Sequence, residues 1–377
     1  MLKVMTVVGT RPEIIRLSEC IKSCDRYFDH TLVHTGQNYD YELNEIFFKD
    51  LNLRTPDFYL SAAGDDLGQT MGNIIAKSYA LFARKRPDAL LILGDTNSTL
   101  CAISAKRLKI PIFHMEAGNR CFDQNVPEEI NRKIVDHIAD INLPYTEHSR
   151  RYLLAEGFRK EHIFVTGSPM TEVLAVHKNA IEASTILKTL EIEKEKYFVV
   201  SAHREENIDN ETTFNSLMNS LNALAETYNL PLIYSTHPRS KKRLEERGFK
   251  FHPLIRSLKP LGFHDYNHLQ QNSFCVLSDS GTLSEESAIL GFPAVLIRTS
   301  TERPEVLDKG SIVIGGITER EIQQGVKLTR AMWENGEQYA IVSDYQDKNV
   351  SVKVIKLLQS YTSIVNNHVW MKKAAEG

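Results

Sequence analysis

Apolar and polar positions alternate along this chain with two different spacings. Short continuous apolar runs, typical of strands buried on both faces, are separated by longer segments with helical spacing. This alternation predicts an α/β fold with mainly parallel sheets covered by helices. In the first half of the 377 residues, the predicted strands are Leu2–Val8, Thr31–His34, Ala89–Leu93, Ile110–Met115, Ile141–Pro144 and Ile163–Val165. The predicted helices run from Gly9–Glu13 to about Cys24, over about Leu67–Arg86 and over about Asn97–Leu108.

The same alternation begins again after Thr166-Gly-Ser-Pro, where glycine and proline mark a boundary. We therefore predict two similar α/β domains, with the first ending at residue 167 and the second beginning at residue 168. In the second half, the predicted strands are Tyr197–Ser201, Pro231–Ser235, Phe274–Ser278 and Ala294–Ile297, and the predicted helices are Thr212–Thr227, Leu283–Leu290, Ile317–Asn335 and Val350–Thr362.

Composition and charge narrow the possible functions. The formal net charge of −3 provides no electrostatic case for binding nucleic acid or an anionic membrane. No apolar run approaches the roughly 18 residues that span a bilayer, and the N-terminus reads as a strand rather than a signal peptide. The five cysteines are odd in number and form no C-x-x-C pair. These features predict a cytoplasmic protein with reduced thiols, and they argue against a zinc site.

Three carboxylates stand out between Leu93 and Arg132. Asp95 and Glu116 each follow a predicted strand, and Glu128 follows Pro127 at the start of a predicted helix. Because ligands of open α/β sheets bind beyond the carboxyl ends of the strands, these acids are expected to meet in one cleft. Three acids in one cleft indicate proton transfer.

Each carboxylate also has a structural interpretation. Asp95 could cap the helix that starts near Asn97, and Glu128 could complement a helix dipole. Glu116 directly follows Ile110–Met115 and has no evident capping role. Taken together, the three acids favour a functional role.

Two strand–helix turns are candidate anion sites. At Gly9–Glu13, backbone N–H groups at a helix start and the charge of Arg11 suit an anion, although a plain turn with a surface arginine is equally compatible. In Ser278–Glu286, the start of a helix offers donors from Ser280, Gly281 and Thr282, and Glu286 suits the two hydroxyls of a ribose. The structural alternative is a capping box of Thr282 and Glu285.

Further polar residues follow predicted strands of the second half. His203 and Arg204 suit acid–base or phosphate chemistry, and His237 repeats this pattern more weakly. Arg298 lies in the last such turn, together with Thr301 and Glu302. No D-x-D motif or metal-spaced histidine pair occurs, so we expect arginines and helix ends, rather than a metal ion, to neutralise a bound diphosphate.

Seven motifs of this chain resemble those of a known family. GTRPE, GDTNST, MEAGNR, VPEEINRK, AHREEN, SDSGTLSEE and RTSTERPE occur in the order and spacing of the non-hydrolysing UDP-N-acetylglucosamine 2-epimerases. The resemblance extends from about Leu2 to Gly315. It implies two Rossmann-like domains that face each other across a cleft in the GT-B arrangement, with residues 360–377 returning to the first domain and 168–359 forming the UDP-binding domain. It also implies a homodimer and no cofactor.

The resemblance implies roles for individual residues. Asp95, Glu116, Glu128 and His203 match the catalytic residues, and Arg11 matches the arginine at the diphosphate. The UDP-binding loop corresponds to Ser280, Gly281, Thr282 and Glu286, and Tyr266 falls where the family has an aromatic residue against uracil. Which carboxylate removes the carbon 2 proton and which returns one stays open.

Several departures from the common pattern point to one branch. Arg16 replaces lysine, GQNYDYE replaces a GQH-type segment, Thr282 replaces glycine and Glu205 replaces arginine. Asn38 and Asp40 lie in GQNYDYE. They put in doubt whether this chain has the activating UDP-sugar site that some family members have. The variants resemble the epimerase that converts UDP-2-acetamido-2,6-dideoxy-L-talose to UDP-N-acetyl-L-fucosamine for capsule or O-antigen synthesis.

Four other functions remain as alternatives. An epimerase for UDP-GlcNAc and UDP-ManNAc is the nearest, and a hydrolysing epimerase would release UDP and free sugar. A GT-B glycosyltransferase would share the fold but has no evident use for three carboxylates in a cleft. A non-catalytic UDP-sugar sensor would bind UDP without exchanging the carbon 2 proton.

Overall fold

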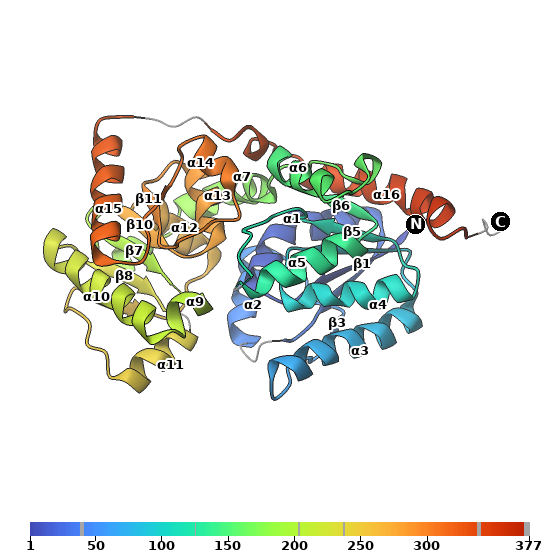
Figure 1. Cartoon of the computed structure of the whole chain (residues 1–377), viewed down its shortest axis with the longest axis horizontal. Helices are drawn as coiled ribbons and strands as arrows, with labels where there is room; N and C mark the ends of the chain where they lie inside the picture. The colour runs from blue at the N-terminus through green and yellow to red at the C-terminus, as the bar shows by residue number, and fades with distance from the viewer. Residues whose placement is uncertain (38–40, 125, 203, 237, 338–340, 373–377) are drawn as a thin grey trace. The chain divides into compact units, whose positions relative to one another are not determined.

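The structure is a computed structural model that describes residues 1–37, 41–124, 126–202, 204–236, 238–337 and 341–372. The chain divides into two compact units (Figure 1). Unit 1 comprises Met1–Ala175 and Gln346–Gly377, and unit 2 comprises Val176–Tyr345. The first unit thus ends later than the residue 167 boundary proposed from sequence, and the chain returns to it before residue 360.

Unit 1 contains, in its described part, a six-stranded parallel sheet in the order β3-β2-β1-β4-β5-β6. Its strands are β1 (Lys3–Val8), β2 (Asp29–His34), β3 (Phe58–Tyr59), β4 (Ala89–Leu93), β5 (Ile112–Met115) and β6 (Ile141–Leu143). All five residues of β4 are buried, as expected for a strand covered on both faces. The predicted strand Ile163–Val165 is wrong, because only an isolated bridge joins Ile163 to Asn142.

Helices follow the strands of unit 1 and cover its sheet. They are α1 (Arg11–Tyr27), α2 (Tyr41–Asp50), α3 (Leu67–Lys85), α4 (Cys101–Arg107), α5 (Pro127–Ile138), α6 (Glu147–Ala155) and α16 (Val350–His368), with 3-10 turns η1 (Asn97–Leu100) and η2 (Lys160–His162). The helix predicted to start near Asn97 therefore begins as a 3-10 turn. The C-terminal helix α16 contacts α1, which attaches the end of the chain to unit 1. Helix α7 (Pro169–Glu182) contains the boundary between the two units.

Unit 2 repeats this topology. In the residues described, its parallel sheet has the order β12-β11-β10-β7-β8-β9. The strands are β7 (Phe198–Ser201), β8 (Leu232–Ser235), β9 (Ile255–Leu258), β10 (Cys275–Ser278), β11 (Ala294–Leu296) and β12 (Val313–Ile314). The helices are α8 (Ile186–Thr189), α9 (Glu205–Ile208), α10 (Glu211–Tyr228), α11 (Pro238–Arg247), α12 (Phe263–Gln271), α13 (Gly281–Leu290), α14 (Pro304–Asp308) and α15 (Glu319–Glu334), with the 3-10 turn η3 (Ser343–Tyr345).

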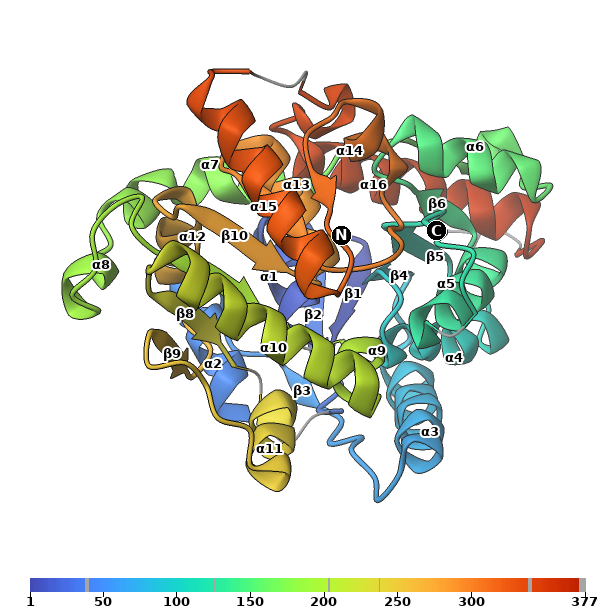
Figure 2. The ribbon, with the colours of Figure 1, turned by 60° about the vertical axis from the view of Figure 1, so that its left-hand side comes forward.

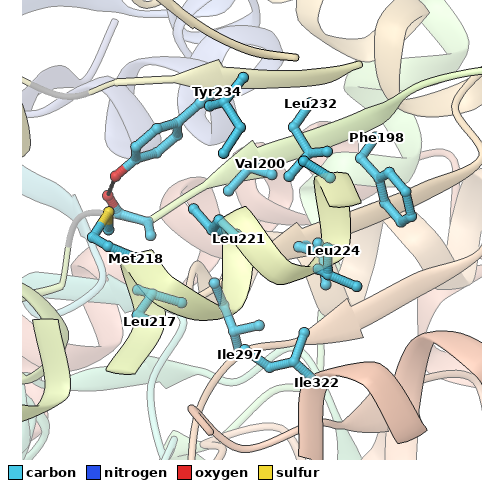
Figure 3. Close-up of a cluster of buried hydrophobic side chains, with 14 of the residues drawn as sticks. Phe198, Val200, Leu217, Met218, Leu221, Leu224, Leu232, Tyr234, Ile297 and Ile322 are labelled. Carbon is cyan, nitrogen blue, oxygen red and sulfur yellow. Dashed lines mark hydrogen bonds between the residues drawn. The ribbon is translucent and has the colours of Figure 1, made fainter. Parts of the chain in front are cut away.

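The core of unit 2 shows why its helices cover the sheet. Helices α10 and α15 lie side by side over one sheet face (Figure 2). On α10, Leu217, Leu221 and Leu224 recur at helical spacing and are fully buried against the strand residues Val200 and Leu232 (Figure 3). The apolar stripe therefore holds α10 on the sheet.

Both sheets have the strand order of a Rossmann-like domain, and the predicted fold class is confirmed for each unit. In such sheets, the strand order reverses beside the first strand, and the loops beyond that point form a crevice. The reversal lies between β1 and β4 in unit 1, and between β7 and β10 in unit 2. None of the helices in the described chain is long and apolar enough to span a bilayer.

Replacing Leu221 by alanine tests the α10 contact. Because Leu221 is fully buried, we expect the free energy of unfolding to fall by about 2–5 kcal/mol, measured by urea unfolding followed by circular dichroism. The matched control is Leu328→Ala on α15, where the leucine is 52% exposed and the expected change is within about 0.5 kcal/mol. Equal losses for the two variants would contradict the packing described here.

Candidate active site

The turns after β4 and β5 bring two of the predicted carboxylates to the same edge of the unit 1 sheet. Asp95 follows Gly94 at the end of β4, and Glu116 directly follows β5. Both Gly94 (φ 78°) and Glu116 (φ 64°) have left-handed backbone, which is uncommon for a residue other than glycine. A Cβ at Gly94 would stand 3.3 Å from Glu116 Oε2. The Glu116 carboxylate therefore lies against the turn that carries Asp95.

Glu116 is held by an arginine from α1. Arg16 Nη1 donates to Glu116 Oε2 at 2.7 Å, and both side chains are buried. Asn119 Nδ2 makes a longer contact, 3.4 Å, with Glu116 Oε1. Because a buried carboxylate needs a compensating charge, Arg16 explains how Glu116 can lie in this turn.

Asp95 is held by an arginine from α5. Arg132 donates from Nε at 3.0 Å and from Nη2 at 2.6 Å to Asp95 Oδ2. Its Nη1 donates at 2.6 Å to Oε2 of Glu129, which is almost fully buried. The sequence analysis missed Glu129 and Arg132, although their i, i+3 spacing in the segment VPEEINR was a usable signal.

Glu128 occupies the second position of α5, after Pro127 at the first. Its side chain is half-buried, and it stands four residues before Arg132, which places both residues on the same face of the helix. The helix start is as predicted. An acid in the first turn also interacts favourably with the helix dipole. The structural interpretation of Glu128 therefore still holds.

The turn after β1 could be an anion site or a plain turn on the sequence alone. Its backbone N–H groups at Gly9 and Thr10 donate to Glu13 Oε2 at 2.6 and 2.7 Å. Thr96 donates to the other oxygen of Glu13 at 2.8 Å, and Ser98 does the same. Burial raises the pKa of Glu13, although these hydrogen bonds oppose the shift. Glu13 thus joins the turns after β1 and β4, where the strand order reverses.

Arg11 remains a candidate ligand for an anion. It is the first residue of α1, and its guanidinium carbon lies 5.7 Å from the centre of the Phe47 ring. This distance is that of a cation–π contact, which helps to orient the side chain.

A buried network supports the loop that carries Glu116. His114 contacts the Gly94 carbonyl oxygen at 2.7 Å through Nε2, and its Nδ1 lies 2.9 Å from Asp136 Oδ1. Arg120 Nη1 donates to Asp136 Oδ2 at 2.7 Å, and the Gly118 N–H also points to Asp136. Burial alone would raise the pKa of Asp136, but His114 and Arg120 lower it overall. Asp136 is therefore a fixed negative charge beneath the loop.

Unit 2 has a comparable arrangement where its strand order reverses. Asp279, after β10, accepts hydrogen bonds from the Arg204 N–H at 2.9 Å and from Asn207 Nδ2 at 3.1 Å. Glu302 accepts one from Arg298 Nη1 at 2.7 Å and contacts Arg204 Nη2 at 3.4 Å. Glu302 therefore holds two of the predicted binding arginines together.

The start of α13 adjoins this cluster. A Cβ on Gly281, the first residue of α13, would stand 2.3 Å from Glu302 Oε1, so only glycine fits without displacing Glu302. Ser280 is the N-cap, and its hydroxyl accepts from the Thr282 N–H at 3.3 Å. The capping box proposed for Thr282 and Glu285 is wrong, because the helix starts earlier and Glu285 pairs with Arg303 at 2.8 Å.

The predicted ribose and uracil residues lie on neighbouring helices of unit 2. Glu286 is buried on α13, and its Oε2 accepts a hydrogen bond of 2.8 Å from Gln270 Nε2 of α12. Tyr266, also on α12, is half-buried against the core. The sequence analysis missed Gln270. His203 and His237 lie outside the described residues.

In each unit, polar side chains stand where the strand order reverses: carboxylates suited to acid–base chemistry in unit 1, and arginines suited to an anion in unit 2. The described residues contain no group of three or more His, Cys, Asp or Glu side chains that could hold a metal ion. Comparison with known proteins gives the family.

The family model for UDP-N-acetylglucosamine 2-epimerase matches residues 22–359. The structure of UDP-N-acetylglucosamine 2-epimerase from Rickettsia bellii is 47% identical in sequence, with a TM-score of 0.91 over 99% of this chain and 100% of that chain. That of the Methanocaldococcus jannaschii UDP-GlcNAc 2-epimerase, in complex with UDP-GlcNAc and UDP, is 30% identical, with a TM-score of 0.89 over 95% and 99%. The Pseudomonas aeruginosa UDP-2,3-diacetamido-2,3-dideoxy-D-glucuronate 2-epimerase is 30% identical over 90% of this chain and 96% of its own length.

Because the family model spans most of the chain, this protein belongs to the UDP-N-acetylglucosamine 2-epimerase family. It is accordingly an isomerase of the non-hydrolysing epimerase type.

Replacing Asp136 by asparagine tests the network beneath the loop. Breaking a buried ion pair costs about 3–5 kcal/mol, and we expect a loss of that size in the free energy of unfolding at pH 7. Because the folded pKa lies below the ordinary value of 3.8, this stabilisation is complete above pH 3.8 and is lost as the pH falls through the folded pKa. The difference between wild type and variant in urea unfolding should therefore shrink in acid.

The control for this prediction is Glu193→Gln. Glu193 pairs with Lys196 at the surface, where both side chains are exposed, so its loss should leave unfolding unchanged. A loss for Asp136→Asn that is no larger than for this control would show that the network does not stabilise the loop.

Proposed function

We propose that this enzyme inverts carbon 2 of a UDP-linked N-acetylhexosamine by eliminating UDP and adding it back. The observation that carries the proposal is the pair of carboxylates at the carboxyl edge of the unit 1 sheet. Asp95 and Glu116 each have their own arginine, Arg132 and Arg16, which lets two acids stay close together. Proton transfer on two faces of one sugar carbon requires such a set of acids and bases.

In the first step, a carboxylate accepts the proton of carbon 2. The electrons of that C–H bond form a double bond between carbons 1 and 2, and the bond from carbon 1 to the diphosphate oxygen breaks with its electrons on UDP. In the second step, the UDP oxygen adds back to carbon 1 and a proton reaches the opposite face of carbon 2. The net reaction is neither oxidation nor reduction, so the proposed cycle needs no redox cofactor.

We assign the proton transfers to Asp95, Glu116, Glu128 and His203, as the family resemblance implies. The leaving diphosphate carries negative charge, and Arg204 and Arg298 near the first turn of α13 are suited to stabilise it. In the same proposal, the other contacts to the UDP-sugar come from Arg11, Arg16, Tyr266, Ser280, Gly281, Thr282, Glu286 and His237.

We further propose UDP-2-acetamido-2,6-dideoxy-L-talose as the substrate and UDP-N-acetyl-L-fucosamine as the product. The support is sequence-based: Arg16, Thr282, Glu205 and the segment GQNYDYE depart from the common family pattern together. The Pseudomonas aeruginosa relative carries the name of a different sugar at 30% identity, so the sugar varies among proteins this similar. UDP-GlcNAc is the second candidate, because the more similar Rickettsia bellii protein is titled a UDP-N-acetylglucosamine 2-epimerase.

Proton NMR in deuterated water tests both reaction and substrate. With the L-talose substrate, we expect deuterium at carbon 2 of the product and new L-fucosamine signals, because the returned proton comes from solvent-exchanged groups. Exchange with UDP-GlcNAc alone would retain the mechanism and overturn the substrate. Exchange with neither sugar, together with transfer of the sugar to an acceptor, would favour a glycosyltransferase.

The amide variants Asp95→Asn, Glu116→Gln and Glu128→Gln test the carboxylates. Each keeps the shape of the side chain but removes its proton-transfer capacity, so we expect turnover to fall about 10²–10⁴-fold. The matched control is Glu147→Gln on α6 of the same unit, an exposed acid for which turnover should stay at the wild-type level. Near-normal rates in all three site variants would refute the carboxylate assignment.

A further inference from the structure

Arg132 makes two hydrogen bonds to Asp95, one of the proposed catalytic acids. Its side chain is only 4% exposed, and both Nε and Nη2 donate to the same oxygen of Asp95, Oδ2. Across the described residues, no hydrogen bond reaches the other oxygen, Oδ1. The Asp95 side chain is 23% exposed, so one oxygen is held while part of the carboxylate stays accessible.

The other side of Arg132 is anchored to a fixed charge. Glu129 Oε2 accepts from Arg132 Nη1 at 2.6 Å, and it also accepts from the Cys121 N–H at 3.2 Å. Burial alone would raise the pKa of Glu129, but the Cys121 hydrogen bond and the charge of Arg132 lower it overall. Glu129 therefore stays ionised and fixes the guanidinium in the orientation that faces Asp95.

The other charged groups near Asp95 are already engaged with their own partners. Glu116, which lies against Gly94, pairs with Arg16, and Glu13 is bound by Thr96 and Ser98 on the Asp95 turn. Arg132 is thus the cation that meets the Asp95 carboxylate directly among the described contacts.

We propose that Arg132 is a positioning residue for Asp95, which fixes the orientation of the Asp95 carboxylate and aims Oδ1 at the reacting sugar. This inference rests on the proposed function. Two charge-assisted hydrogen bonds to one carboxylate oxygen restrict rotation of the side chain. Asp95 then enters the reaction as a proton acceptor whose geometry is set before the substrate binds.

A purely structural role for Arg132 is the alternative, because it also ties α5 to the turn after β4. Asn131 makes that same tie without touching the carboxylate: its Nδ2 donates to the Asp95 carbonyl oxygen at 2.9 Å and to Asn97 Oδ1 at 3.0 Å. Asn131→Ala is therefore a matched control, since it loosens the turn but leaves the pairing of Asp95 and Arg132 intact.

The experiment compares Arg132→Met, Arg132→Lys and Asn131→Ala in the carbon 2 exchange assay. For Arg132→Met we expect kcat to fall about 10²-fold with KM little changed, because misplacing a reacting group costs about that factor. Arg132→Lys should recover part of the lost kcat, because it keeps the charge but not the planar fork.

The control and a double variant complete the test. Asn131→Ala should keep kcat near the wild-type value. Asp95→Asn combined with Arg132→Met should be no slower than Asp95→Asn alone, because Arg132 acts through Asp95. Should Arg132→Met fail to fold, the kcat of Arg132→Lys relative to that of Asn131→Ala decides.

The outcomes separate this proposal from the function on which it rests. With an active wild type, a kcat for the Arg132 variants no lower than for Asn131→Ala, or additive losses in the double variant, would overturn the positioning role alone. A wild type that exchanges neither UDP-sugar would overturn the proposed function, and the positioning role with it.

Discussion

Compensation of buried negative charge is the constraint on which the unit 1 site depends. Four carboxylates, those of Glu13, Asp95, Glu116 and Glu129, lie in or beside the turns at one edge of the sheet. Removing a carboxylate from water costs several kcal/mol unless a cation or several donors replace the lost hydration. Two guanidinium groups and the donors around Glu13 meet that cost, so the arginines are as necessary to the arrangement as the acids.

The sheet topology decides where these charges meet. In each unit the strand order reverses beside the first strand, so the loops after the first and fourth strands of that unit become neighbours. In unit 1, Glu13 links those loops by binding Thr96. In unit 2, Asp279 does so by binding Arg204 and Asn207. The two units thus repeat one solution, in which an acid joins the loops at the reversal point.

The two units differ in the other side chains that lie where the strand order reverses. Unit 1 adds paired carboxylates, which suit proton transfer. Unit 2 adds Arg204 and Arg298 around Glu302, close to the Gly281 backbone at the start of α13. Guanidinium groups and a helix start suit an anionic diphosphate.

Much of this protein follows from local sequence. Apolar runs such as Ala89–Leu93 determine which segments become buried strands, and Pro127 marks the start of α5, because hydrophobic spacing and backbone chemistry act over a few residues. Asp95 and Glu116 were predicted by the same reasoning, since residues after parallel strands share one sheet edge, and Glu128 was predicted from its place after Pro127. The strand wrongly predicted at Ile163–Val165 shows its limit, because this apolar run lies beside β6 but forms only one isolated bridge with it.

Only the tertiary structure decided the partners of these residues. Nothing in the local sequence pairs Arg16 with Glu116, or Arg132 with Asp95, because these side chains come from different elements and meet only when the helices cover the sheet. The backbone donors at Gly9 and Thr10, by contrast, bind Glu13 in a local capping box that the Thr10–Glu13 spacing encodes. The sequence by itself determined the strands, the helices and the candidate acids. Their charge pairing depended on contacts between residues far apart in the chain, which local patterns do not encode.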